Sequence, residues 1–160
     1  MVVVILWTLG SSALFAQDPG RLKEPAIREI RVLYQAVEDS AVAGRYRRAD
    51  TTWTCDGGAV KLDIEALRDS AGLMRRLKVS GGAGDSYQII TYYYDGTGHL
   101  RFAFTTRSAV NGTKHEVRAY WERGGTLLHR DTRGISGPGW AWGDAEEVWE
   151  PEAWVGAGCG

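Results

Sequence analysis

The spacing of apolar residues changes once along this chain, close to residue 50, and this change constrains the fold more than any other feature. Before it, apolar residues recur every three or four positions, as on one side of a helix, and after it they recur at every second position, as in strands. The 21 Gly, 7 Trp and 7 Tyr among 160 residues are typical of antiparallel sheets with tight turns. The sequence predicts an α+β fold, with an N-terminal amphipathic helix packed on a curved antiparallel β-meander of six or seven strands.

The expected helix lies between Pro25, which suits a first helical turn, and Gly44, which suits a C-terminal cap. Its apolar residues form one stripe, whereas charged residues occupy the opposite side. The stripe consists of Ile27, Ile30, Leu33, Tyr34, Val37 and Ala41. We expect this stripe to pack on the sheet.

Seven segments alternate apolar and polar residues and are separated by turns that contain Gly, Asp or Asn. These predicted strands are 51–55, 59–65, 73–79, 86–94, 99–108, 114–123 and 126–132. The glycine-rich stretch 81–84 is interpreted as a flexible turn, because it lacks the helix and the Lys that a phosphate-binding loop needs.

The Asn-Gly pair at 111–112 is a strong signal for a two-residue hairpin turn, and such a turn fixes the register of its strands. A turn at Gly124 and Gly125 and a four-residue loop at 95–98 fix two further registers. The predicted pairs are Arg107 with Glu116, Phe102 with Trp121, Phe104 with Ala119, Arg118 with Asp131, Glu116 with Arg133, Trp121 with Leu128, His129 with Tyr120, Tyr93 with Leu100 and Ile89 with Phe104. Opposite charges then meet on one face and apolar side chains on the other.

These registers sort the strand residues onto two faces. The face expected to meet the helix carries Tyr87, Ile89, Tyr93, Leu100, Phe102, Phe104, Val117, Ala119, Trp121 and Leu128. The opposite face carries Ile90, Tyr92, Tyr94, Arg101, Ala103, Arg107, Glu116, Arg118, Tyr120, Glu122, His129 and Asp131. This second face mixes tyrosines with arginines, the residue types that dominate binding hot spots.

The candidate binding residues therefore come from that face and from the tryptophan-rich tail that follows the strands. They are Tyr92, Tyr94, Arg101, Arg118, Tyr120, Trp140 and Trp142. We expect a non-enzymatic binding or interaction protein, monomeric or homodimeric, whose partner is a protein or a small molecule. With 19 Lys and Arg against 20 Asp and Glu, the chain lacks the basic excess that nucleic acid requires.

Residues suited to catalysis do not converge in the predicted sheet. His99, His115 and His129 fall on three different segments, and the carboxylates Glu116 and Asp131 each face an arginine. We therefore expect no catalytic residue, metal site or cofactor. A small secreted hydrolase stays open as an alternative, because His129, Asp131 and Glu116 would serve if a cleft brought them together.

The N-terminus has the features of a secretory signal. Residues 1–16 are apolar or small, no charged side chain occurs before Asp18, and the run is too short to span a membrane. Cleavage after Ala16 leaves a secreted or periplasmic protein with no membrane span, and an N-terminal anchor is the alternative. In such an oxidising compartment, Cys55 and Cys159 are expected to form one disulfide, with two unpaired thiols as the alternative.

Residues 17–134 are expected to form one domain of helix and sheet, and residues 135–160 a Gly- and Trp-rich acidic tail that packs back on it. Indole side chains at this density rarely remain exposed to water. The tail either covers the sheet or forms a surface for flat ligands.

Several short strings carry a resemblance to known proteins. They are YYYD at 92–95, GHLRF at 98–102, NGT at 111–113, EVRAY at 116–120 and GPG at 137–139. Together they resemble a group of uncharacterised secreted bacterial proteins with a signal peptide, one helix and β-hairpins, and this resemblance implies a fold but no activity. WTCDGG at 53–58 resembles the opening of C-type lysozyme inhibitors, which are small secreted β-barrels, and implies inhibition of a periplasmic lysozyme as an alternative function.

Overall fold

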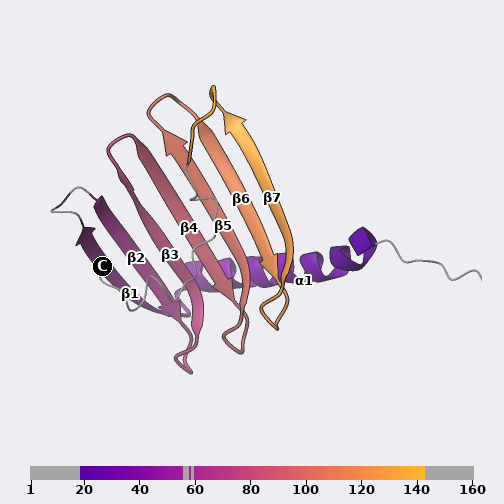
Figure 1. Ribbon diagram of the computed structural model, residues 1–160. Coiled ribbons are helices and arrows are strands. Elements are labelled where there is room, and N and C mark those ends of the chain that lie inside the picture. The colour runs from indigo at the N-terminus through magenta and orange to yellow at the C-terminus, as the bar shows by residue number, and fades with distance from the viewer. Residues whose placement is uncertain (1–18, 56–57, 59, 143–160) are drawn as a thin grey trace, which may run out of the picture.

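The computed structural model describes residues 19–55, 58 and 60–142, which form one helix followed by one sheet. The helix is α1 (Pro19–Val42), and the strands are β1 (Arg47–Cys55), β2 (Val60–Arg68), β3 (Met74–Ala83), β4 (Ser86–Tyr94), β5 (Leu100–Ala109), β6 (Lys114–Trp121) and β7 (Leu127–Ser136). Each strand pairs with the next in antiparallel fashion, so the sheet order follows the sequence (Figure 1). The predicted α+β meander is confirmed. The expected signal peptide, Cys159 and the tail from residue 143 lie outside the described residues.

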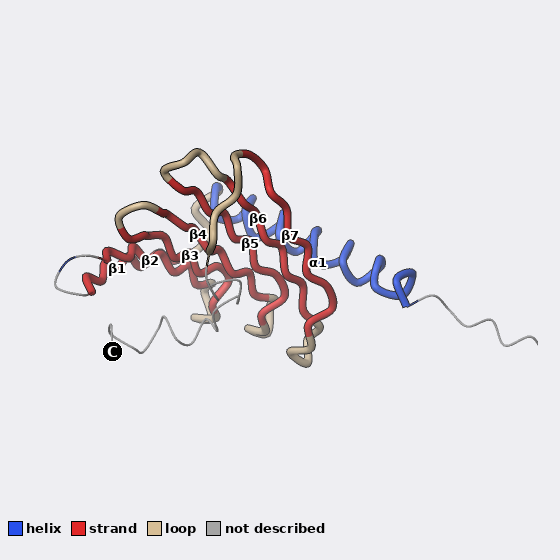
Figure 2. Tube along the Cα trace, turned by 45° about the horizontal axis from the view of Figure 1, so that its top comes forward, coloured by secondary structure: helices blue, strands red, loops and turns tan. Residues whose placement is uncertain are grey.

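Helix α1 crosses the strands on one face of the twisted sheet, and its N-terminal turns extend past the edge strand β7 (Figures 1 and 2). It begins at Pro19, earlier than predicted, and Pro25 lies inside it. It ends at Val42, and Gly44 follows as the predicted C-terminal cap, whose φ of 67° allows the Arg45 N–H to donate to the Ser40 carbonyl (3.0 Å). This is the Schellman arrangement that terminates many helices.

Four hairpin loops share one three-residue design, in which the last loop residue is a glycine with positive φ. These glycines are Gly72, Gly98, Gly112 and Gly125, with φ between 83° and 86°. In the β5–β6 loop, Ala109 N–H donates to the Thr113 carbonyl (2.9 Å) and Gly112 N–H donates to the Ala109 carbonyl (3.0 Å). The Asn-Gly pair thus fills the last two positions of a three-residue loop, which is the next commonest hairpin connection after the two-residue turn.

The extra loop residue makes the predicted β5–β6 register wrong by one position. The observed pairs are Phe102 with Tyr120, Ala103 with Ala119, Phe104 with Arg118 and Arg107 with His115, in place of Phe102 with Trp121, Phe104 with Ala119 and Arg107 with Glu116. A shift of one residue moves every side chain of a strand to the other face. Arg118 and Tyr120 therefore share the face of Phe102, and Val117, Ala119 and Trp121 do not.

The predicted β4–β5 and β6–β7 registers agree with the structure to different extents. The β4–β5 prediction is wrong by two positions, which preserves the faces, and the β6–β7 prediction is confirmed up to a bulge after Tyr120. The observed pairs are Tyr93 with Phe102, Ile89 with Thr106, Arg118 with Asp131, Glu116 with Arg133, Tyr120 with His129, and, beyond the bulge, Trp121 with Leu127 rather than Leu128.

The interpretation of residues 81–84 as a flexible turn is also wrong, because Gly81 and Gly82 belong to β3 and only residues 84–85 form the turn. A Cβ atom on Gly81 would lie 2.2 Å from the Lys61 carbonyl oxygen, and one on Gly82 would lie 2.0 Å from the Ser86 carbonyl oxygen. Close backbone approach within the strands requires these glycines.

The sheet buries apolar side chains on both faces. The cluster that includes α1 consists of Ile27, Ile30, Val37, Tyr93, Phe102 and Tyr120. The cluster on the other face consists of Ile64, Leu77, Val79, Ile90, Tyr92, Tyr94 and Ala103. The neighbours Tyr92 and Tyr93 are 0% and 4% exposed on opposite sides of the same strand, so both faces are shielded from water.

The carboxylate of Glu38 connects the C-terminal half of α1 to the sheet. It accepts a hydrogen bond from the Tyr93 hydroxyl (2.9 Å) and pairs with the Arg76 guanidinium (2.9 Å), which also binds Glu65 of β2. Burial, together with this adjacent carboxylate, raises the pKa of the Tyr93 hydroxyl above its usual range. Tyr93 therefore stays a neutral donor, and Glu38 fixes where the helix lies on the sheet.

We predict that Glu38→Ala lowers the free energy of unfolding by about 1–3 kcal/mol, because it removes the acceptor of Arg76 Nη1 and of the Tyr93 hydroxyl at a half-buried site, although Arg76 keeps Glu65. The matched control is Asp39→Ala, which removes an exposed carboxylate that accepts a hydrogen bond from Gln35 of the same helix. Urea denaturation measures both. Equal losses in the two variants would contradict the role assigned to Glu38.

Candidate functional site

A cavity of about 260 Å³ lies between α1 and strands β5 and β6. Its lining residues come from three elements and are Ile30, Arg31 and Tyr34 of α1, Phe102 and Phe104 of β5, and Arg118 and Tyr120 of β6. Helix α1 contributes Ile30 and Tyr34, which are one turn apart, and β5 and β6 contribute a row of large aromatic side chains. The apolar stripe of α1 and this aromatic row do not fill all the space where α1 crosses β5 and β6, and the cavity is the space that remains.

The aromatic walls of the cavity hold one another in place. Tyr34 meets Phe102 edge-on with ring centroids 5.6 Å apart, and Phe102 lies 4.9 Å from Tyr120. Behind them, Tyr93 packs against Tyr34 at 5.0 Å and is held by Glu38. Each aromatic pair contributes about 0.5–1.5 kcal/mol beyond its buried area. The walls are therefore preformed.

Arg118 supplies the polar part of the cavity wall. Its guanidinium carbon lies 5.0 Å from the centre of the Phe104 ring, and its Nη2 donates to Glu116 Oε2 at 2.6 Å. A guanidinium has five N–H donors in a planar fork, so the ion pair with Glu116 engages only part of it. Arg31, an exposed residue of α1, brings a second positive charge to the cavity lining.

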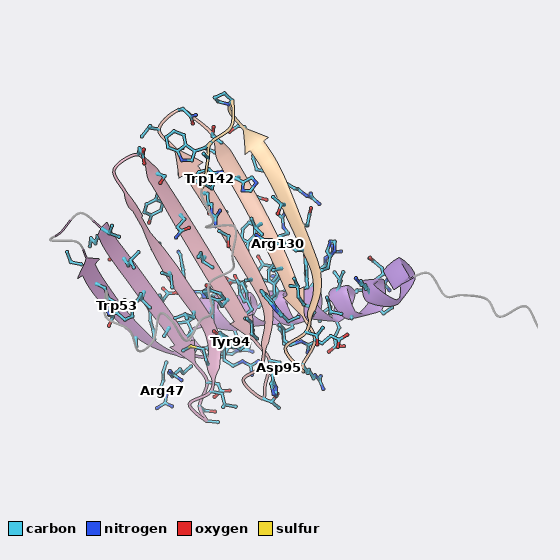
Figure 3. The ribbon with its side chains drawn as sticks, in the orientation of Figure 1. Arg47, Trp53, Tyr94, Asp95, Arg130 and Trp142 are labelled. Carbon is cyan, nitrogen blue, oxygen red and sulfur yellow. The ribbon has the colours of Figure 1, made fainter. Side chains whose placement is uncertain are left out.

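The residues proposed from the sequence as one binding surface lie in four places. Arg118 and Tyr120 line the cavity, whereas Tyr92 and Tyr94 are buried on the opposite face of the sheet. Figure 3 shows Tyr94 and Trp142 well apart along the sheet. The shift in the β5–β6 register separates the members of this set. Sequence reasoning placed Ile30, Tyr34, Phe102 and Phe104 in the core, and a correct register would have placed Arg118 beside them.

Trp140 and Trp142 lie close to the start of β6, where the chain returns after β7. Their rings are 6.3 Å apart, and the Trp142 ring stacks 6.3 Å from His115. The Arg107 guanidinium carbon lies 5.9 Å from the centre of the Trp142 ring. A hollow of about 240 Å³ borders Trp142, Arg107 and Tyr87. Compared with the cavity under α1, it has fewer aromatic side chains on its walls.

Arg101 has a structural environment at the end of the sheet near the β4–β5 loop. It is 5% exposed, its Nε donates to the Trp121 carbonyl (3.0 Å), and its Nη1 lies 3.6 Å from Asp95 Oδ2. Asp95 Oδ1 also accepts hydrogen bonds from the Thr97 hydroxyl (2.6 Å) and from the backbone N–H groups of Thr97 (2.9 Å) and His99 (3.1 Å). Burial opposes ionisation of Asp95, but these bonds outweigh it and lower its pKa to about 2.

The three histidines lie apart, as the sequence predicted. His99 contacts Thr97 (2.8 Å), His115 stacks on Trp142, and His129 stacks on Tyr120 with centroids 6.1 Å apart. Within residues 19–55, 58 and 60–142, no three or more His, Cys, Asp or Glu side chains are grouped so as to hold a metal ion. In the same ranges, no helix has the length and apolar character needed to cross a membrane.

Comparisons with protein-family models, with curated proteins and with solved structures find no match to this chain. The cavity and its chemistry are therefore the basis for a functional proposal.

We predict that Asp95→Asn lowers stability at neutral pH and flattens the acid limb of the stability curve. Because the folded-state pKa is about 2, below the ordinary value of 3.8, the charged carboxylate stabilises the fold above pH 4. That stabilisation is lost as the pH falls from 4 to 2. Urea midpoints across this range are the measurement. Asp85→Asn, an exposed carboxyl in the β3–β4 turn, is the control, and the same flattening in both variants would contradict the assignment.

Proposed function

We propose that this protein is a non-enzymatic binding protein that holds a small amphipathic anion in the cavity under α1. The ligand class is one aromatic ring or a short alkyl chain that carries a carboxylate. The observation that supports the proposal is an aromatic-walled cavity of about 260 Å³ with a guanidinium in its wall. Among the described residues, no separate feature favours the alternatives of a lysozyme inhibitor or a small hydrolase.

The size of the cavity limits the ligand. An apolar cavity of about 150 Å³ is large enough for benzene. A cavity of about 260 Å³ therefore has room for one ring and a small polar group, and it is slightly smaller than the sites that hold drug-sized ligands. Tyr34, Phe102 and Tyr120 offer ring faces and edges that suit such a body.

The charge of the cavity selects the polar group. Arg118 forms bidentate hydrogen bonds readily with a carboxylate, and Arg31 adds to the positive potential. Glu116 already neutralises part of Arg118, so it competes with an anionic ligand. A cationic ligand of the same size would meet two guanidinium groups and is disfavoured.

The proposal predicts that benzoate binds with a Kd on the order of 0.1–1 mM, whereas benzylamine, a cation of similar size, does not bind measurably. Arg118→Gln weakens benzoate binding by about tenfold or more, the value of one charge-assisted hydrogen bond. Glu116→Gln has the opposite effect and strengthens it, because it frees the guanidinium. Two-dimensional NMR titration of the full chain measures affinity and the site of binding together.

Arg48→Gln is the matched control for these variants, because Arg48 forms a similar ion pair along β1 with Asp50 (2.9 Å) and does not line the cavity. It should leave benzoate affinity unchanged. The proposal fails if benzoate shifts no resonance of the cavity residues, or if Arg118→Gln and Arg48→Gln weaken binding equally while both remain folded.

We further propose that the protein acts outside the cytoplasm, on the strength of its uncharged apolar residues 1–16 and its two cysteines. Expression in a Gram-negative bacterium with the native N-terminus should give a periplasmic protein that begins at Gln17. Its non-reduced peptide map should contain one disulfide-linked pair, from Cys55 and Cys159. N-terminal sequencing and mass spectrometry test both points, and a cytoplasmic product that retains Met1 would contradict export.

A further inference from the structure

We propose that the C-terminal segment, residues 143–160, lies over the face of the sheet that is turned away from α1. The strongest observation is the burial of that face. Tyr92, Leu77, Ile90 and Val79 are between 0% and 2% exposed. They belong to the cluster formed by side chains of β2 to β5, with Trp53 and Trp121 at its margins.

A single sheet cannot produce such burial by itself. Its side chains project from the face, so their ends are exposed to solvent unless another layer packs on them. In the part of the chain that the structure describes, α1 lies on the other face (Figures 1 and 2). The chain after β7 reaches the buried face through Trp142, which borders one hollow together with Leu62, Gly81 and Arg107.

The route of the chain after β7 is fixed against the β5–β6 loop. Asn111 Nδ2 donates to the Gly139 carbonyl (3.0 Å), and Gly139 N–H donates to Thr113 Oγ1 (3.2 Å). Position 137 requires glycine, because a Cβ atom there would lie 2.5 Å from Thr113 Cα, which is too close for a side chain. The main chain is therefore directed back over the sheet before Trp142, and Trp142 itself lies beside Arg107.

The composition of the remaining segment complements the face. Trp149 and Trp154 provide aromatic surface for the apolar cluster, and the carboxylates suit Arg107, which is 4% exposed on this face. No Lys or Arg follows Arg133 in the sequence. The acidic residues are Asp144, Glu146, Glu147, Glu150 and Glu152.

The segment is also long enough to cross to the first strand. Cys55 ends β1 at the end of the sheet where β6 begins, so it lies at the same end as Trp142. Four strand spacings separate β1 from β5, or about 19 Å, whereas 17 extended residues span up to about 56 Å. The disulfide proposed between Cys55 and Cys159 is therefore compatible with this route. This inference concerns the face opposite the ligand cavity and does not depend on the proposed function.

Residue-resolved oxidative footprinting tests the proposal, because Tyr92 and Tyr93 are adjacent but face opposite ways. In the full chain, both should be protected, and Tyr87, which is 46% exposed, should be labelled. In a chain that ends at Trp142, labelling of Tyr92 and Tyr94 should rise several-fold, whereas Tyr93 under α1 should stay protected. Tyr93 is thus the internal control for an intact fold.

If the shortened chain does not fold, as a rise in Tyr93 labelling would reveal, the full-length double variant Trp149→Ala/Trp154→Ala takes its place, with the same expectation for Tyr92. Protection of Tyr92 that persists in a folded variant overturns the proposal. Protection that disappears on dilution of the full chain also overturns it, because a second copy would then be the cover. Selective exposure of Tyr92 and Tyr94 in a monomer supports it.

Discussion

Both faces of this sheet bury aromatic side chains, so neighbouring residues of one strand need cover from opposite directions. Tyr92 and Tyr93 of β4 show the constraint at a single peptide bond, because each is almost fully buried and they point to different sides. The described residues contain one helix, and its apolar stripe covers one face. The cavity under α1 and the buried opposite face both follow from this imbalance between two apolar faces and one helix.

The elements of the fold could be predicted from the sequence because alternation and the helical stripe are local signals. Ile27, Ile30 and Val37 are buried as their spacing indicated, and every predicted strand overlaps an observed one. The registers were harder, since a hairpin register depends on whether a loop has two residues or three. Asn111 and Gly112 fit either loop, and the decisive signal was the glycine that ends four loops of the same design.

The candidate site was predicted in part. The residues that were assigned to the wrong face were misplaced by the same one-residue error in the β5–β6 register. Arg118 and Tyr120 were proposed from residue type, yet for a face on which they do not lie. Arg118 lies next to Glu116 and Asp131 whichever way β6 pairs with β5. These charge pairs therefore do not distinguish the predicted β5–β6 register from the observed one. The contribution of Tyr34 and Ile30 depends on where α1 crosses the sheet, and this is a tertiary property that periodicity does not encode.

The crossing point of α1 is set by two groups of ion pairs of unequal strength. Toward its C-terminal end, Glu38 contacts Arg76 and Tyr93 at 2.9 Å in half-buried surroundings. Toward its N-terminal end, the exposed Glu29 lies 3.5 Å from the exposed Arg123 and 3.8 Å from Arg101, and these longer pairs to an exposed carboxylate contribute less. The cavity between Ile30 and Tyr34 lies between these anchors. The position of its helical wall is therefore determined mainly by Glu38, through the ring of Tyr93 that also supports Tyr34. The residue that fixes the helix on the sheet and the residues that shape the cavity thus belong to one connected set of contacts.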